Sequence, residues 1–170
     1  RQQVTAGWEA VLKWDLPGAA ERVASEAVEL LTAEPCPRDM RTTVILGGDH
    51  FITYPLVQGF RDAVAEGGRN KKVGYIQFSS QLDLGDEDPV WGRVWRGATA
   101  RRIMDSGAVD TKNMVWVGAN GYIRTEQLEL AQELDLKVFT LEDIRRQGIV
   151  AVARQAAEIA GEGCDSVYLS

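Results

Sequence analysis

Residues 73–84 read VGYIQFSSQLDL, an apolar run followed at once by polar residues. The run 73–78 is nearly all apolar, which is typical of a strand buried on both faces of a parallel sheet. Sheets of this kind place their ligands at the carboxyl ends of the strands. The polar residues that follow, from Ser79 to Asp83, are therefore the first candidates for a functional site.

The rest of the chain alternates between helical and strand patterns. We expect helices over residues 18–33, 54–65, 96–106, 125–134 and, capped by Thr140, 141–160. Strands are expected over residues 42–46, 73–78, 114–117, 137–140 and 166–169, with a long loop over residues 79–95. Helices that alternate with apolar strands predict a three-layer α/β/α architecture with a mainly parallel sheet. We expect one domain over residues 1–170.

Composition excludes several classes of protein. A net charge of −6 argues against a nucleic-acid binder, and no apolar run approaches the roughly 20 residues of a membrane span. Cys36 and Cys164 match no metal or redox spacing, so we expect reduced, buried thiols in a cytoplasmic protein. The chain starts without Met and stops just after a strand. We therefore expect a fragment, incomplete at both ends, with further site residues beyond Ser170.

Four segments lie at or directly after predicted strands. Taken in chain order, each is similar to a motif of one enzyme family. The segment GGDHFITYPL at residues 47–56 resembles the GGDHSITYPL of arginases and agmatinases. IQFSSQLDL at residues 76–84 is similar to that family's I-H-F-D-A-H-x-D-L. VGANGY at residues 117–122 resembles I-G-x-R-G-Y, and residues 165–170 look like the lead-in to S-F-D-x-D. The chain thus resembles the ureohydrolase superfamily from about residue 40 onward.

The resemblance implies a manganese site with an altered ligand set. In the family, two Mn²⁺ ions bind a hydroxide that attacks a guanidinium carbon and releases urea. His50 matches the first histidine ligand and Asp83 the last aspartate of the second motif. Ser79 stands where the family has Asp, Gln81 where it has His, and Gln77 replaces a histidine that commonly precedes the motif. We expect Mn²⁺ at reduced stoichiometry or not at all.

The resemblance also implies two residues of a substrate pocket. Trp91 stands where the family has a histidine involved in substrate or proton handling, and Asn120 lies in the segment that resembles I-G-x-R-G-Y. Trp91 and Trp95 either line a pocket for an apolar or cationic ligand or fill volume that metals and polar groups have vacated.

Three functional interpretations are consistent with these residues. The first is a ureohydrolase homologue with weak or no amidinohydrolase activity. The second is a divergent agmatinase-like hydrolase of a C–N bond with one metal ion, held by His50, Asp83 and carboxylates beyond Ser170. The third is an α/β binding domain without this chemistry. A small guanidino compound is the expected partner, and relatives commonly form trimers or hexamers, so a homo-oligomer is expected.

Plainer roles exist for the same residues. His50 is the one histidine in the chain, so histidine chemistry depends on it, but it also fits a hydrogen-bonded turn residue. Asp49 is expected to accept hydrogen bonds from loop backbone. The acidic run of Asp83, Asp86, Glu87 and Asp88 lacks the spacing of a calcium loop, which favours a solvated loop.

Overall fold

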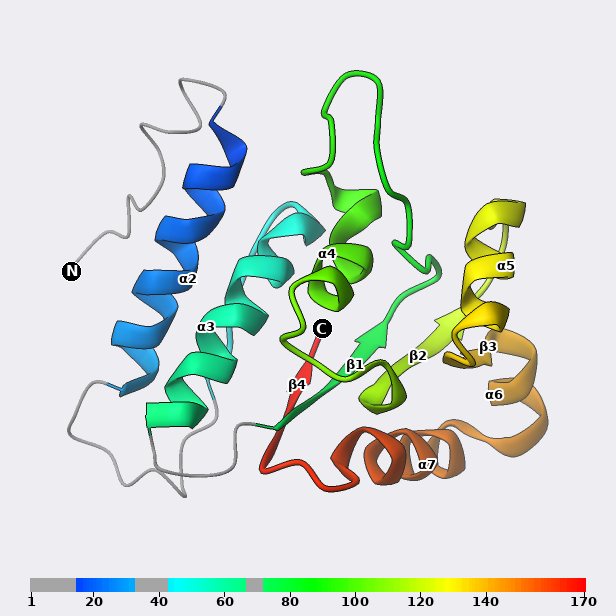
Figure 1. The fold of residues 1–170 in the computed structure, drawn as a ribbon. Helices are drawn as coiled ribbons and strands as arrows, with labels where there is room; N and C mark the ends of the chain where they lie inside the picture. The colour runs from blue at the N-terminus through cyan, green and yellow to red at the C-terminus, as the bar shows by residue number, and fades with distance from the viewer. Residues whose placement is uncertain (1–14, 33–42, 67–71) are drawn as a thin grey trace.

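The computed structural model describes residues 15–32, 43–66 and 72–170, which form helices around a parallel sheet (Figure 1). Within these residues the strands are hydrogen-bonded in the order β3-β2-β1-β4, and every neighbouring pair is parallel. The strands are β1 (Val73–Phe78), β2 (Met114–Ala119), β3 (Lys137–Thr140) and β4 (Ser166–Leu169). The predicted parallel sheet is confirmed.

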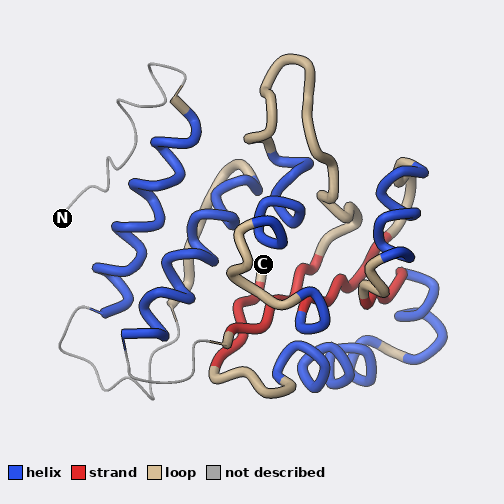
Figure 2. Tube along the Cα trace, viewed as in Figure 1, coloured by secondary structure: helices blue, strands red, loops and turns tan. Residues whose placement is uncertain are grey.

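The helices cover both sides of this sheet (Figure 2). They are α2 (Leu16–Thr32), α3 (Thr53–Glu66), α4 (Thr99–Asp105), α5 (Thr125–Glu133), α6 (Leu141–Gln147) and α7 (Ile149–Gly161). Single 3₁₀ turns, η2 (His50–Ile52), η3 (Arg96–Ala98) and η4 (Thr111–Asn113), precede α3, α4 and β2. None of the helices in the described ranges is long and apolar enough to cross a membrane.

Side chains that alternate along the strands build one apolar core on each face of the sheet. Tyr75 and Trp116 are fully buried and pack on one face with Val57 of α3 and Ile103 of α4. The opposite face contributes Ile76, Val115 and Val117 to a second core with Val152, Ala156 and Ala160 of α7. Each fully buried valine or isoleucine side chain in these cores contributes about 1.5–3 kcal/mol to folding. The two cores confirm the three-layer arrangement.

The strand predicted over residues 42–46 is not present in the described part of that segment. Residues 43–46 run outside the sheet, and Val44 and Leu46 are 77% and 92% exposed. Thr42 lies outside the described residues. A β-branched run becomes a strand only when a neighbouring strand supplies hydrogen bonds. None of the described strands pairs with residues 43–46, so propensity alone gave a wrong assignment.

The helix predicted from Thr140 to about residue 160 is two helices. The cap itself is confirmed: Thr140 accepts from the backbone N–H of Asp143, and the Asp143 side chain accepts from that of Thr140. α6 then ends at Gln147. The next residue, Gly148, has a φ of 84°, a left-handed conformation that glycine tolerates, and α7 begins directly after it. The periodicity continues across the break, which is why the sequence suggested one helix.

Smaller differences concern the loop, the next helix and the thiols. Residues 79–95 form the expected long loop, with one bridge between Asp88 and Gly92. The helix expected over residues 96–106 starts as the 3₁₀ turn η3 before α4. Cys164 is a free thiol but only half-buried, and Cys36 lies outside the described residues.

Gly74 permits α7 to lie directly against β1. A Cβ at this position would be 1.9 Å from the carbonyl oxygen of Ala160. We expect Gly74→Ala to destabilise the fold by about 1–3 kcal/mol or more in urea unfolding, since a backbone atom must move. Gly161→Ala is the matched control, because its Cβ would meet only Val167 at 4.0 Å. Equal stability of the two variants would contradict this account of the packing.

The cap of α6 makes part of the stability depend on pH. Hydrogen bonds from the side chain and then the backbone of Thr140 lower the pKa of Asp143 below its ordinary value. The cap therefore stabilises the fold above the unfolded-state pKa and loses this effect as the pH falls through the folded-state pKa. We expect Asp143→Asn to reduce the loss of thermal stability between neutral and acidic pH. An unchanged pH profile would show that the cap does not contribute.

Candidate functional site

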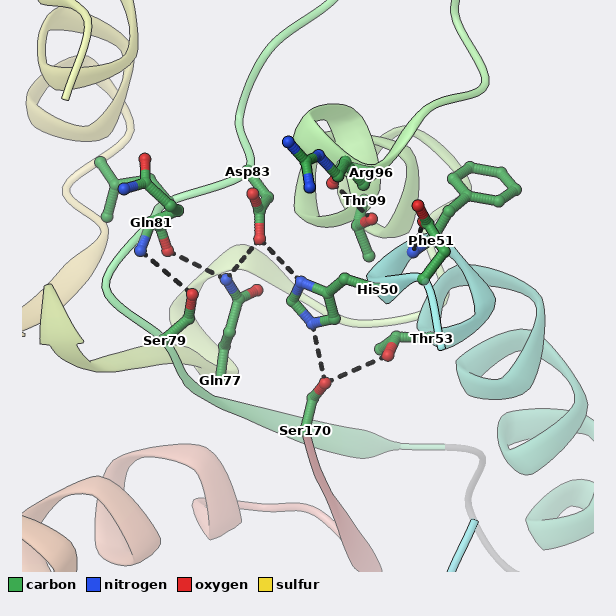
Figure 3. A network of polar contacts seen from close by, with 12 residues as sticks. His50, Phe51, Thr53, Gln77, Ser79, Gln81, Asp83, Arg96, Thr99 and Ser170 are labelled. Carbon is green, nitrogen blue, oxygen red and sulfur yellow. Dashed lines mark hydrogen bonds and ion pairs between the residues drawn. The ribbon is translucent and has the colours of Figure 1, made fainter. Parts of the chain in front are cut away.

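His50, Asp83 and Ser170 come together at the carboxyl edge of the sheet from three separate segments (Figure 3). His50 opens η2 directly before α3, Asp83 lies in the loop after β1, and Ser170 follows β4. Asp49 caps η2 by accepting a hydrogen bond of 2.8 Å from the backbone N–H of Phe51, as expected from the sequence. The local turn thus directs His50 toward the sheet.

The His50 ring uses both of its nitrogens. Nδ1 lies 2.8 Å from Oδ2 of Asp83, and Nε2 lies 2.9 Å from Oγ of Ser170. Ser170 Oγ is also 3.1 Å from Oγ1 of Thr53. Since an ionised carboxylate only accepts, the Asp83 contact assigns the Nδ1 hydrogen to this bond. In the neutral ring Nε2 then accepts from the Ser170 hydroxyl.

Gln77 and Tyr75 support Asp83 from within the core. Gln77 Nε2 donates to Asp83 Oδ2 over 2.9 Å and to the carbonyl oxygen of Gln81 over 3.0 Å. The Tyr75 hydroxyl donates to Gln77 Oε1 over 2.9 Å. Burial raises the pKa of Tyr75 far above its ordinary value, so this hydroxyl stays a donor. The Asp83 carboxylate is consequently fixed from two sides.

The loop that carries Asp83 is held in an uncommon backbone conformation. Asp83 has a φ of 52°, a left-handed conformation that costs about 1 kcal/mol or more in a residue other than glycine. Its carbonyl accepts from the backbone N–H of Arg101, and the Leu82 carbonyl accepts from Nε1 of Trp116. These bonds to α4 and β2 maintain the strained residue and orient its carboxylate.

Ser79 and Gln81 are the two residues that the sequence predicts at altered ligand positions. Ser79 Oγ accepts a hydrogen bond of 3.0 Å from the backbone N–H of Gln81, and the Gln81 side chain is exposed. Within residues 15–32, 43–66 and 72–170, no three His, Cys, Asp or Glu side chains are grouped as metal ligands. The expected ligand pair, His50 and Asp83, does meet.

Trp91 and Asn120, the residues expected to line a substrate pocket, follow β1 and β2 respectively. Trp91, 48% exposed, sits in the turn of the long loop, where Asp88 accepts from its backbone N–H and from that of Val90. Asn120 is exposed after β2, and its backbone N–H donates to the Ser80 carbonyl over 3.1 Å. The Trp95 ring packs over Gly85 and Gly97. Whether Trp95 lines a ligand pocket or fills vacated volume stays a prediction.

The acidic run of the long loop does not converge on one point. Asp86 pairs with Arg102 and Arg93, and the hydrogen bond from Arg102 lowers the pKa of Asp86. The Asp88 carboxylate accepts a hydrogen bond from the backbone N–H of Val90, whereas the Asp83 carboxylate contacts His50. This dispersal matches a solvated loop better than a calcium site.

Sequence reasoning missed Thr53 and Tyr75 as members of the network. Tyr75 and Gln77 are polar residues two apart in a strand that is otherwise apolar, so both project from the same face. That spacing was the available signal. No comparable signal marked Thr53, whose role depends on how α3 approaches β4.

Comparison with protein families and curated proteins gives consistent matches. A model described as "Arginase family" matches residues 6–170. Formimidoylglutamase of Halalkalibacterium halodurans is 25% identical over 157 residues, 92% of this chain and 46% of its own length. Mitochondrial agmatinase of Gallus gallus is 26% identical over 158 residues, 92% of this chain and 42% of its own length. The chain thus spans less than half the length of these two relatives.

Solved structures of similar fold carry related names. Formimidoylglutamase from Bacillus subtilis superimposes with a TM-score of 0.74 at 16% identity, covering 89% of this chain and 44% of that one. Formiminoglutamase of Trypanosoma cruzi, solved with Mn²⁺, gives a TM-score of 0.70 at 20% identity, covering 86% and 46%. At these identities the likeness concerns the fold.

We expect His50 and Asp83 to be energetically coupled. Each replacement by alanine leaves a partly buried polar partner, so a double-mutant cycle in urea should give a coupling of about 0.5–3 kcal/mol. The exposed pair Glu142 and Arg145, 3.7 Å apart, serves as control and should couple by about 0.5 kcal/mol or less. If the first pair couples no more strongly than the second, the 2.8 Å contact contributes nothing specific.

Proposed function

The chain belongs to the arginase family, and from this membership we propose that it is a ureohydrolase homologue with weak or no amidinohydrolase activity. The observation that carries the proposal is the donor set at the carboxyl edge of the sheet. His50 and Asp83 are present and adjacent, whereas serine and glutamine stand at the two other ligand positions of the same loop.

The described residues do not fit a pair of Mn²⁺ ions. Two divalent cations held close together need several carboxylates to offset their charge, and hard oxygen and imidazole donors to bind them. Asp83 is the carboxylate at this point in the described part of the chain, and the Ser79 hydroxyl is engaged by the Gln81 backbone. Loss of an outer partner alone costs about ten- to a hundredfold in metal affinity, so two lost ligands cost more.

A hydrolase with one metal ion is the second candidate. The 2.8 Å contact between His50 and Asp83 supports it, because one imidazole and one carboxylate already converge there. Carboxylates outside this sequence would have to complete the site. The reaction would be the hydrolysis of a C–N bond in an agmatinase-like manner.

The relatives' names support a proposal for the substrate class. They include agmatinase, guanidino acid hydrolase and formimidoylglutamase, whose substrates are guanidino or formimidoyl compounds. We therefore propose a small guanidino or amidine compound as the ligand, with Trp91 and Asn120 near its side-chain end. A homo-oligomer in the cytoplasm remains our prediction.

Metal content distinguishes the two candidates. The full-length protein is incubated with Mn²⁺, desalted and measured by elemental analysis, and urea release is assayed over guanidino compounds. We expect little bound metal and background urea release. About one ion per chain together with urea release would favour the mononuclear hydrolase, and two ions would refute the proposal.

Restoring the family's residues at positions 79 and 81 tests whether these two positions are ligand positions. We expect Ser79→Asp combined with Gln81→His to raise Mn²⁺ affinity at least about tenfold, because a carboxylate and an imidazole return to the loop. Ser80→Asp is the control, since it adds the same charge at the neighbouring exposed position. An unchanged affinity in the restored variant would mean that these positions are not ligand positions.

A further inference from the structure

Gln77 is a polar side chain in the centre of an apolar strand, and it has no exposed surface. A glutamine amide offers two N–H donors and one carbonyl acceptor. Both donors are used, on Asp83 Oδ2 and on the Gln81 carbonyl, and the carbonyl accepts from Tyr75. The amide thus leaves none of its own polar groups unpaired, so its burial avoids the free-energy cost of an unsatisfied hydrogen-bonding group.

The neighbours fix which way this amide points. Turning the amide over would place Gln77 Oε1 against two acceptors, the carboxylate of Asp83 and the carbonyl of Gln81. The observed orientation instead sends an N–H toward Asp83, and the Tyr75 hydroxyl holds the opposite end. Gln77 is therefore a dedicated donor to the Asp83 carboxylate.

The Asp83 carboxylate requires such a donor. Its side chain is only 11% exposed, and a buried carboxylate is costly unless it is paired and hydrogen-bonded. Two groups reach Oδ2: Nδ1 of His50 at 2.8 Å and Nε2 of Gln77 at 2.9 Å. In a metal site a cation would compensate this charge; here the amide of Gln77 and the imidazole of His50 do so by hydrogen bonding.

We infer that Gln77 takes the place of a cation: its amide holds Asp83 and His50 together in a site that is stable without metal. The inference rests on the proposed function, since it assumes that no pair of Mn²⁺ ions occupies this edge. Through His50 the effect extends to Ser170 and Thr53, so the amide helps to fasten η2, the loop after β1 and the end of β4 to one another (Figure 3). Gln77 is a positioning residue.

Two substitutions of similar size test this role in the full-length protein. Gln77→Glu removes both N–H donors and sets a second carboxylate against Asp83, whereas Gln77→Leu removes the polar group altogether. Melting temperatures are measured at pH 8 in EDTA and in excess Mn²⁺, and Mn²⁺ binding is measured separately by competition with a metal indicator.

The wild-type protein is expected to melt at the same temperature in EDTA and in Mn²⁺. In EDTA both variants should melt about 5 °C or more below it, because they leave buried polar groups unpaired. Mn²⁺ should raise the Tm of Gln77→Glu, which joins two carboxylates to His50, and should leave Gln77→Leu unchanged. If Gln77→Glu folds only when Mn²⁺ is present, the inference is equally supported.

Two results would overturn the inference. One is a wild-type Tm that falls in EDTA and recovers in Mn²⁺, which would show that a cation already holds the site. The other is a Gln77→Leu variant as stable as wild type in EDTA, which would show that the amide holds nothing. The second result leaves the proposed function intact, because that proposal is judged by metal content and urea release.

Discussion

The contact between Nδ1 of His50 and Oδ2 of Asp83 joins segments 33 residues apart in the chain. On one side it fixes η2, the first turn of the segment that continues as α3. On the other it fixes a loop residue with a positive φ. Ser170 adds the end of β4 to the same ring. A single imidazole and its two partners thus link the start of one helix to the loop after β1 and to the end of β4, and backbone hydrogen bonds also join these two strands.

The contact between His50 and Asp83 matters because it lies next to polar side chains that are buried in β1. β1 is covered on both faces, so the polar side chains of Tyr75 and Gln77 must find partners within the protein. They do so by forming a chain of hydrogen bonds that ends at Asp83. The same geometry would bring an imidazole and a carboxylate to a metal ion. What separates the two uses is the number of carboxylates nearby, because hydrogen-bond donors stabilise one negative charge whereas a pair of divalent cations needs several.

Much of the fold was predictable because its signals are local. The apolar run 73–78 and the cap at Thr140 were both assigned correctly from neighbouring residues. The assignments failed where the outcome depends on something distant or on one backbone angle. Residues 43–46 have strand-like composition but lack a pairing partner among the described strands, and Gly148 divides a continuous apolar periodicity by its φ.

For the site, the sequence by itself determined which chemical groups are available: one histidine, an aspartate in the loop after β1, and serine and glutamine where the family resemblance predicts metal ligands. It also placed Ser79, Gln81 and Asp83 directly after the strand 73–78, at the carboxyl edge of the sheet. Only the tertiary structure decided the partners. The pleat of β1 directs Tyr75 and Gln77 to the same face, and the approach of α3 to β4 brings Thr53 close to Ser170. Ser79 instead accepts a hydrogen bond from the backbone of Gln81. Hydrogen bonds depend on distances of a few tenths of an ångström between segments remote in sequence, and the packing of the sheet against α3 and α4 sets those distances.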